Sequence, residues 1–298
     1  MFENRRANLL VGFALAVGVA GLISFPFGWI LTDSVHLAGE MPIGQPVLAG
    51  ATLLGIGAVV NDVCLFGTLS RISKGELRFL AVPVGLAHGF ALAEFADLRG
   101  TVAAAPNRLE QPSTAGYAAV AGFGVLFGSA WFWLRRSGDA ATSHRWTLRT
   151  AMTVLGIGGA LLFAMAPGWT YAEELKRDIA LRPVMVMFGA GAIGWTATGL
   201  AVATLAGAFA AGVVARHFRY QRPDARGIAR SLSGGALMAV GAVLVPGGND
   251  TLLLWSLPAA TVSGLLAYGT MTGVVFALLA IPCWWPFRAP AAENSRVG

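Results

Sequence analysis

Long apolar runs separated by short polar segments make up most of this chain. Runs of about 17–25 apolar residues are long enough to cross the hydrocarbon core of a bilayer as helices. The pattern predicts such helices over 8–25, 46–66, 78–96, 116–134, 147–167, 231–247 and 258–281. A longer run, 183–215, is either one tilted crossing or a re-entrant piece followed by a crossing. The expected fold is therefore all-α, a polytopic membrane protein with about eight or nine transmembrane helices.

Composition supports this expectation. Of the 298 residues, 56% are hydrophobic and only 12% are charged, whereas soluble domains carry roughly 25% charged residues. This excludes an ordinary soluble enzyme and a nucleic-acid-binding module. The net charge of +6 is better explained by basic loops that set orientation in the membrane than by a polyanionic partner.

The distribution of Lys and Arg predicts which loops face the cytoplasm. Basic residues gather before the first helix and in the segments 67–77, 135–149 and 216–230, whereas 26–45 contains none. If 183–215 is one crossing, these basic segments alternate to one side, and both termini are cytoplasmic. The segment 168–182, with mixed charge, is a mild exception.

Two segments of the chain resemble one another. Aligned without gaps, 50–60 and 234–244 share five of eleven residues. The matches are Gly50/Gly234, Leu53/Leu237, Gly57/Gly241, Ala58/Ala242 and Val59/Val243. The predicted topology makes the two segments run in opposite directions, which is typical of the inverted repeats of secondary transporters.

Each of these segments then breaks at polar residues, Asn61-Asp62 in the first and 247–250 in the second. Asn and Asp are good helix N-caps, so they predict short helices over 63–72 and 251–257. Free N–H groups at helix starts attract anions, and the Cys64 thiol adds a donor. The candidate substrate path comprises Asn61, Asp62, Cys64, Gly67, Thr68, Gly247, Gly248, Asn249, Asp250 and Thr251. The alternative is that both breaks are ordinary loops at the membrane edge, with Asn and Asp capping normal helices.

Other candidate chemistry is sparse. His88 falls within a predicted span, where an ionisable side chain often marks a polar or proton relay; a neutral histidine bonded to a neighbouring helix fits equally well. The motifs CxxC, HExxH, GxxxxGK[ST] and GxSxG do not occur in the sequence. We therefore expect no metal, no cofactor and no enzymatic activity.

Residues 57–78, GAVVNDVCLFGTLSRISKGELR, resemble the first signature of the YeeE/YedE family of bacterial sulfur-compound transporters, and 234–257 resemble its second. The resemblance implies membrane helices with short helices entering from both faces, and uptake of thiosulfate or a related species. It implies that Cys64 is the first cysteine on the path. The second Gly-Gly turn of the family commonly carries a cysteine where Asn249 stands here, and Cys283 matches no family motif, so that a small buried hydrophobe is expected there.

With the polar breaks, the resemblance implies a permease of the bacterial inner membrane for a small, thiosulfate-like sulfur anion. The alternative is a membrane-embedded sulfur-delivery or docking component for a cytoplasmic sulfur-carrier or sulfurtransferase protein, with 216–230 as its docking face. One transmembrane domain is expected, divided into a first half 1–115, connecting helices 116–182, a second half 183–287 and a cytoplasmic tail 288–298.

Overall fold

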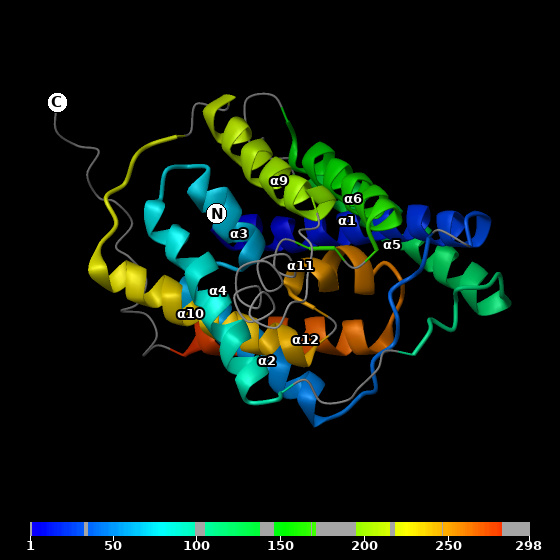
Figure 1. Cartoon of the computed structure of the whole chain (residues 1–298). Helices are drawn as coiled ribbons and strands as arrows, with labels where there is room; N and C mark the ends of the chain where they lie inside the picture. Colours follow the sequence, from blue (N-terminus) through cyan, green and yellow to red (C-terminus); the bar gives the residue numbers. More distant parts are fainter. Residues whose placement is uncertain are drawn as a thin grey trace.

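The structure is a computed structural model, and it describes part of the chain. The described residues are 2–32, 35–98, 105–137, 146–167, 169–170, 195–214, 218–245 and 247–281. Within these ranges the chain forms helices (Figure 1), and the only β pairing is two isolated bridges, Glu40 with Ala105 and Glu76 with Gln221.

The helices have the following bounds: α1 Phe2–Ile30, α2 Gln45–Asn61, α3 Leu65–Ile72, α4 Ala81–Phe95, α5 Thr114–Arg136, α6 Leu148–Met165, α9 Trp195–Val214, α10 Ala225–Leu244, α11 Asn249–Thr251 and α12 Val262–Ala280. A 3₁₀ turn η1 (Leu77–Leu80) precedes α4, and a π-helical segment η3 (Leu252–Ser256) continues α11.

Seven of the described segments are long and apolar enough to cross a membrane: Asn8–Ile30, Gln45–Ile72, Leu77–Phe95, Thr114–Arg136, Leu148–Met165, Ala225–Leu244 and Val262–Ala280. The predicted all-α, polytopic membrane fold is thereby confirmed. The number of crossings predicted for 183–215 lies partly outside the described residues, which include only α9 of that range.

Three predicted helix starts are wrong: α1 begins at Phe2 rather than 8, and caps explain the other two. α10 begins at Ala225 rather than 231, because the Asp224 side chain accepts a hydrogen bond from the Gly227 N–H at 3.0 Å. The last helix begins at Val262 rather than 258, because Thr261 caps it and Ala260 before it has a positive φ of 55°. A side-chain cap satisfies free N–H groups of the first turn, so capping residues rather than hydrophobicity set these boundaries.

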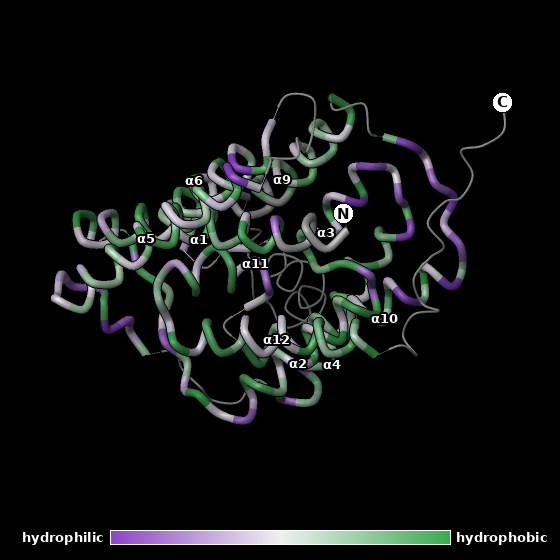
Figure 2. The backbone as a smooth tube through the Cα atoms, turned by 180° about the vertical axis from the view of Figure 1, so that it is seen from behind, coloured by the Kyte–Doolittle hydropathy of each residue, from purple (hydrophilic) through white to green (hydrophobic). Residues whose placement is uncertain are grey.

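The helices form two groups that pack side by side (Figure 1). One group has α1 packed against α5 and α6, and the other has α10 packed against α2 and α4, with α12 on the far side of α2. The tube in Figure 2 is largely hydrophobic along the helices of both groups. Large apolar side chains also point outward, for example Leu92 and Val125, 62% and 72% exposed. Such outward faces suit a lipid environment.

The crossing of α2 and α10 depends on glycine. A Cβ added to Gly57 would lie 2.8 Å from the Gly234 carbonyl oxygen, and one added to Gly234 would lie 2.8 Å from the Gly57 oxygen. Gly50 and Gly241 form a second such pair, at 2.7 and 2.6 Å. Only residues without a side chain let two backbones approach this closely.

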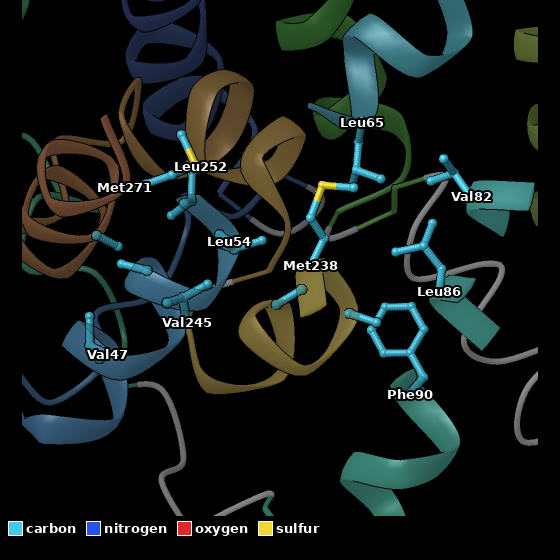
Figure 3. Packing of buried hydrophobic residues seen from close by; sticks show 14 of the residues in the cluster. Val47, Leu54, Leu65, Val82, Leu86, Phe90, Met238, Val245, Leu252 and Met271 are labelled. Carbon is cyan, nitrogen blue, oxygen red and sulfur yellow. The ribbon is translucent and has the colours of Figure 1, made fainter. Parts of the chain in front are cut away.

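Two clusters of buried hydrophobic side chains hold the groups together. Figure 3 shows the first, in which side chains of α2, α3, α4, α10 and α12 converge around Met238 and Leu54. The second surrounds Phe25 and Phe123 between α1, α5 and α6. The segment η3 contributes to both, with Leu252 in the first cluster and Leu254 in the second. The polar breaks of the chain therefore lie where the two groups of helices meet.

Candidate functional site at two broken helices

The first break separates α2 from α3. Asn61 is the last residue of α2, and Asp62 follows in the left-handed conformation, with φ 73°. Cys64, in an extended conformation, is the N-cap residue of α3. The short helix predicted over 63–72 is present from Leu65, but the predicted caps are wrong: Asn61 and Asp62 end the preceding helix. Asp tolerates the left-handed region better than most residues, which explains why it ends a helix here.

Asn61 fixes the shape of this first break. It is fully buried, and its Nδ2 donates hydrogen bonds to the Val63 oxygen at 2.9 Å and to Thr68 Oγ1 at 3.2 Å. The Thr68 hydroxyl in turn donates to the Cys64 oxygen at 3.1 Å. These bonds tie the end of α2 to the first turn of α3, so that the position of Cys64 is determined by buried polar contacts.

Asp62 faces two arginines on neighbouring elements. Its Oδ2 lies 3.0 Å from Arg78 Nη2 in η1, and its Oδ1 lies 2.6 Å from Arg230 Nη2 in α10. Arg230 also donates from Nε to the Val60 oxygen at 3.1 Å. The carboxylate of Asp62 is thus engaged by cations. Sequence reasoning missed both arginines as site residues, because their charges already fitted the orientation rule.

The second break, after α10, is built on glycine. Gly247 has φ 97°, and a Cβ there would also lie 2.7 Å from Thr251 Cβ. Gly248 is the N-cap residue of α11, without a side-chain cap, so the prediction that Asn249 or Asp250 caps this helix is wrong. Both are inside the helix, which begins two residues earlier than the predicted 251–257 and continues as η3.

The starts of the two short helices meet. The Cys64 thiol lies within hydrogen-bonding reach of the Asn249 side chain and of the backbone N–H groups of Phe66 and Gly67. Gly248 lies against Leu65, and α3 and α11 are neighbours in Figure 1. We call this meeting point of Cys64, Gly67, Gly248 and Asn249 the junction. Asn249 is only 6% exposed, and among the described residues its Oδ1 has no hydrogen-bond partner.

A cavity of about 300 Å³ adjoins the junction. Its walls are mostly apolar and come from α3, α6, the residues after α6, α9, the second break and η3. They include Leu65, Phe66, Phe163, Leu254, Trp169, Thr204 and Asp250. The Trp169 indole Nε1 is buried there without a hydrogen-bond partner in the part of the chain that the structure describes. An apolar cavity with a few polar groups is the usual form of a small-molecule site.

Comparison with known families decides the affiliation of the chain. A family model described as sulphur transport matches residues 1–277. The chain belongs to the sulphur transport family. This confirms the resemblance to YeeE/YedE proteins inferred from the two signatures. A comparison with curated proteins finds no match. Family membership and the apolar helices together support a sulfur-compound transporter in a membrane.

The structure of this sulphur transport protein brings only some of the predicted site residues to the junction. Thr68 is buried one turn from Cys64, and Thr251, also buried, packs against Gly247. Asp62 points to the arginines. His88 is exposed on α4, where its Nδ1 lies 2.8 Å from the Val84 oxygen of the same helix, so it does not lie among the junction residues. Cys283 lies outside the described residues.

Two further expectations concern partners. Among the described residues, no group of three or more His, Cys, Asp and Glu side chains could hold a metal ion. The predicted docking of a cytoplasmic sulfur-carrier or sulfurtransferase protein stays a prediction. Arg222 and Arg226, within the segment 216–230, are exposed, as a docking face would require.

Proposed function

We propose that this protein is a permease that carries a small, thiosulfate-like sulfur anion across the bacterial inner membrane, through the junction of the two broken helices. The observation that carries the proposal is the contact between the Cys64 thiol and the Asn249 side chain at the starts of two short helices.

The chemistry of the junction suits such an anion. Backbone N–H groups at a helix start and the helix dipole favour negative charge. The N–H groups of Phe66 and Gly67 already point at the sulfur of Cys64, so an anion at that position would accept the same donors. The Asn249 amide and the Cys64 thiol add a neutral donor each. Neutral donors hold an anion weakly enough to release it, which transport requires.

The packing of α2 and α10 supports a transport mechanism based on an inverted repeat. In the aligned segments, Gly50 corresponds to Gly234 and Gly57 to Gly241. Gly50 contacts Gly241, and Gly57 contacts Gly234. A two-fold axis between equivalent helices produces this reciprocal pattern. We take α2–α3–α4 and α10–α11–η3–α12 as the two repeat units, whose relative movement would open the junction alternately to each side.

Uptake of labelled thiosulfate by proteoliposomes tests the proposal. Replacing Cys64 by Ala removes the thiol from the junction, and we expect the initial rate to fall by about tenfold or more, as when one specific donor to a bound anion is lost. Cys64→Ser keeps a small donor and should retain an intermediate rate. Cys283→Ala, which removes the other cysteine of the chain, should transport at the wild-type rate.

Sulfite, sulfide and sulfate in place of thiosulfate define the substrate class. Wild-type protein that carries none of these species would contradict the proposal. If Cys64→Ala transports at the wild-type rate, and its thermal melting shows that it is folded, a role for the thiol is rejected.

A further inference from the structure

Two arginines converge on one carboxylate just beyond the junction. Arg78 and Arg230 each contact one oxygen of Asp62, at 3.0 and 2.6 Å. Both guanidinium side chains are only 17% exposed, and the carboxylate side chain is 24% exposed. The three residues come from η1, α10 and the end of α2, so the cluster connects three separate elements.

The two guanidinium groups are held independently of Asp62. The Arg78 guanidinium lies over the ring of Phe79, 4.3 Å from its centroid, and Phe79 is fully buried. Arg230 Nε donates to the Val60 oxygen at the end of α2. Because ring stacking and a backbone bond orient the arginines, their Nη atoms would keep their place if the carboxylate moved away.

The carboxylate, by contrast, is carried on a turn in the left-handed conformation. Asp62 has φ 73°, a conformation that is uncommon for a residue with a side chain and persists where its surroundings enforce it. Among the described residues, its carboxylate bonds to the two arginines. The turn leads directly to Cys64, two residues further on, which is the N-cap of α3.

The chemistry of this pair matches the substrate class of the proposed function. Guanidinium groups bind carboxylates and oxyanions of phosphorus or sulfur through the same forked N–H geometry. Two arginines that converge on one carboxylate are therefore also arranged to receive a sulfur oxyanion. The neighbouring acids have other bonds: Asp224 caps α10 at Gly227, and Glu76 pairs with Arg71.

We propose that Arg78 and Arg230 form an anion site next to the junction, and that Asp62 keeps this site closed by occupying it until the transported anion displaces its carboxylate. The site lies beside the basic loops predicted to face the cytoplasm, so it would receive the anion that leaves Cys64 and Asn249. This inference rests on the proposed function for the identity of the anion and extends it to the release step.

Binding of thiosulfate and of sulfate to the purified full-length protein in nanodiscs tests this inference. Asp62→Asn removes the competing charge and keeps a residue that tolerates the left-handed turn. We expect the dissociation constant of both anions to fall by about tenfold relative to wild type, since a like charge at the site no longer competes. In Asp62→Asn combined with Arg78→Gln this gain should disappear. Asp97→Asn is the matched control, because Asp97 also has a positive φ, 47°, and is not among the ion pairs of Arg78 and Arg230 within the described part of the chain; it should bind as wild type does.

A second variant keeps the test decisive if Asp62→Asn does not fold. Arg78→Gln alone leaves Asp62 paired with Arg230 and should weaken thiosulfate binding about fivefold, as loss of one charged hydrogen bond would. Unchanged or weaker anion binding in folded Asp62→Asn, or unchanged binding in Arg78→Gln, overturns the inference. If the wild type carries thiosulfate while Asp62→Asn gains no affinity, the anion site fails and the permease stands. If Asp62→Asn gains affinity but the wild type carries no sulfur anion, the arginine site stands and the permease fails.

Discussion

The two helix breaks occupy corresponding places in the aligned segments but are held by different forces. At the first break, Asn61 and Asp62 make side-chain hydrogen bonds and ion pairs to four residues. At the second, Gly247 and Gly248 form the turn, Gly248 caps α11 without a side-chain bond, and Leu252 is packed in the first hydrophobic cluster. The first break is fixed by polar contacts and the second by backbone conformation and apolar packing.

This difference indicates a division of roles. At the first break, the Asn61 amide nitrogen bonds to the Val63 oxygen and to Thr68 and thereby positions Cys64, while its Oδ1 atom is buried without a partner among the described residues. At the second break, the Oδ1 atom of Asn249 is likewise buried without a partner among the described residues, a costly state that function can explain, and the Asn249 side chain reaches the Cys64 thiol, where the proposed anion would bind. We therefore expect substitution of Asn61 or Thr68 at the first break to lower mainly stability, and substitution of Asn249 at the second to lower mainly transport.

The largest effect is expected where both breaks depend on one contact, the crossing of α2 and α10. In Gly234→Ala the new Cβ would lie 2.7 Å from Asn61 Cβ and 2.8 Å from the Gly57 oxygen. Backbone atoms cannot move aside cheaply, so we expect a loss of about 3 kcal/mol or more in the free energy of unfolding. Thermal unfolding in detergent and uptake by proteoliposomes would both show a nearly inactive, poorly folded protein.

Gly128→Ala on α5 is the matched control. A Cβ at Gly128 meets no atom within 4 Å, so stability and uptake should equal those of the wild type. Equal stability of the two variants would refute the idea that the α2–α10 crossing sets the geometry of both breaks.

Asn249→Ala should have the next largest effect, on transport rather than on stability. The change removes the side chain that reaches Cys64 and also removes a buried oxygen without a partner. We expect the rate of thiosulfate uptake to fall by about tenfold, since a donor to the anion is lost, while the melting temperature changes by no more than a few degrees.

Asn249→Cys sharpens this result. A thiol is smaller than an amide but also a donor, and we expect this variant to recover part of the uptake that Asn249→Ala loses. A drop in melting temperature in Asn249→Ala as large as that of Gly234→Ala would show that Asn249 is structural, like Asn61.

Much of the fold could be predicted from the sequence, because apolar runs must cross the membrane and cannot be placed elsewhere. The helix pattern from α2 to α6 follows the apolar runs closely. The starts of α10 and α12 could not be placed from hydrophobicity, because Asp224 and Thr261 extend or shorten these helices through their caps.

Only part of the site could be predicted from the sequence, and the physical reason differs from residue to residue. The polar breaks are visible in the sequence, since Asn and Asp rarely interrupt apolar runs without cause. Which side chain points at which partner depends on neighbours distant in the chain. Asp62 could not be assigned to Arg230, because 168 positions separate them, and nothing local indicates that pairing.

Asn61→Ala should have a smaller effect, of the opposite kind to that of Asn249→Ala. The variant loses the bonds to the Val63 oxygen and to Thr68 Oγ1, and we expect a loss of about 2 kcal/mol in the free energy of unfolding, typical of a buried hydrogen-bonded side chain. Uptake per folded molecule should fall less than in Asn249→Ala. Quantifying folded protein by size-exclusion chromatography before each uptake assay separates the two quantities. A larger loss of specific uptake in Asn61→Ala would reverse the division of roles.

Thr68→Val should have the smallest effect. The Thr68 hydroxyl donates to the Cys64 oxygen four residues earlier and accepts from Asn61, so we expect a loss of about 1 kcal/mol in the free energy of unfolding. Thr52→Val is the matched control, because Thr52 donates to the Leu48 oxygen four residues earlier at 2.8 Å, and no hydrogen bond to Asn61 is recorded for it in the described chain. Thr52→Val should lower the free energy of unfolding by less.

In the double variant Asn61→Ala with Thr68→Val, the loss in the free energy of unfolding should be smaller than the sum of the two single losses, because the hydrogen bond between Asn61 and Thr68 is counted in both. Full additivity would show that Asn61 and Thr68 act separately, and that the first break is not held by the polar connection that distinguishes it from the second.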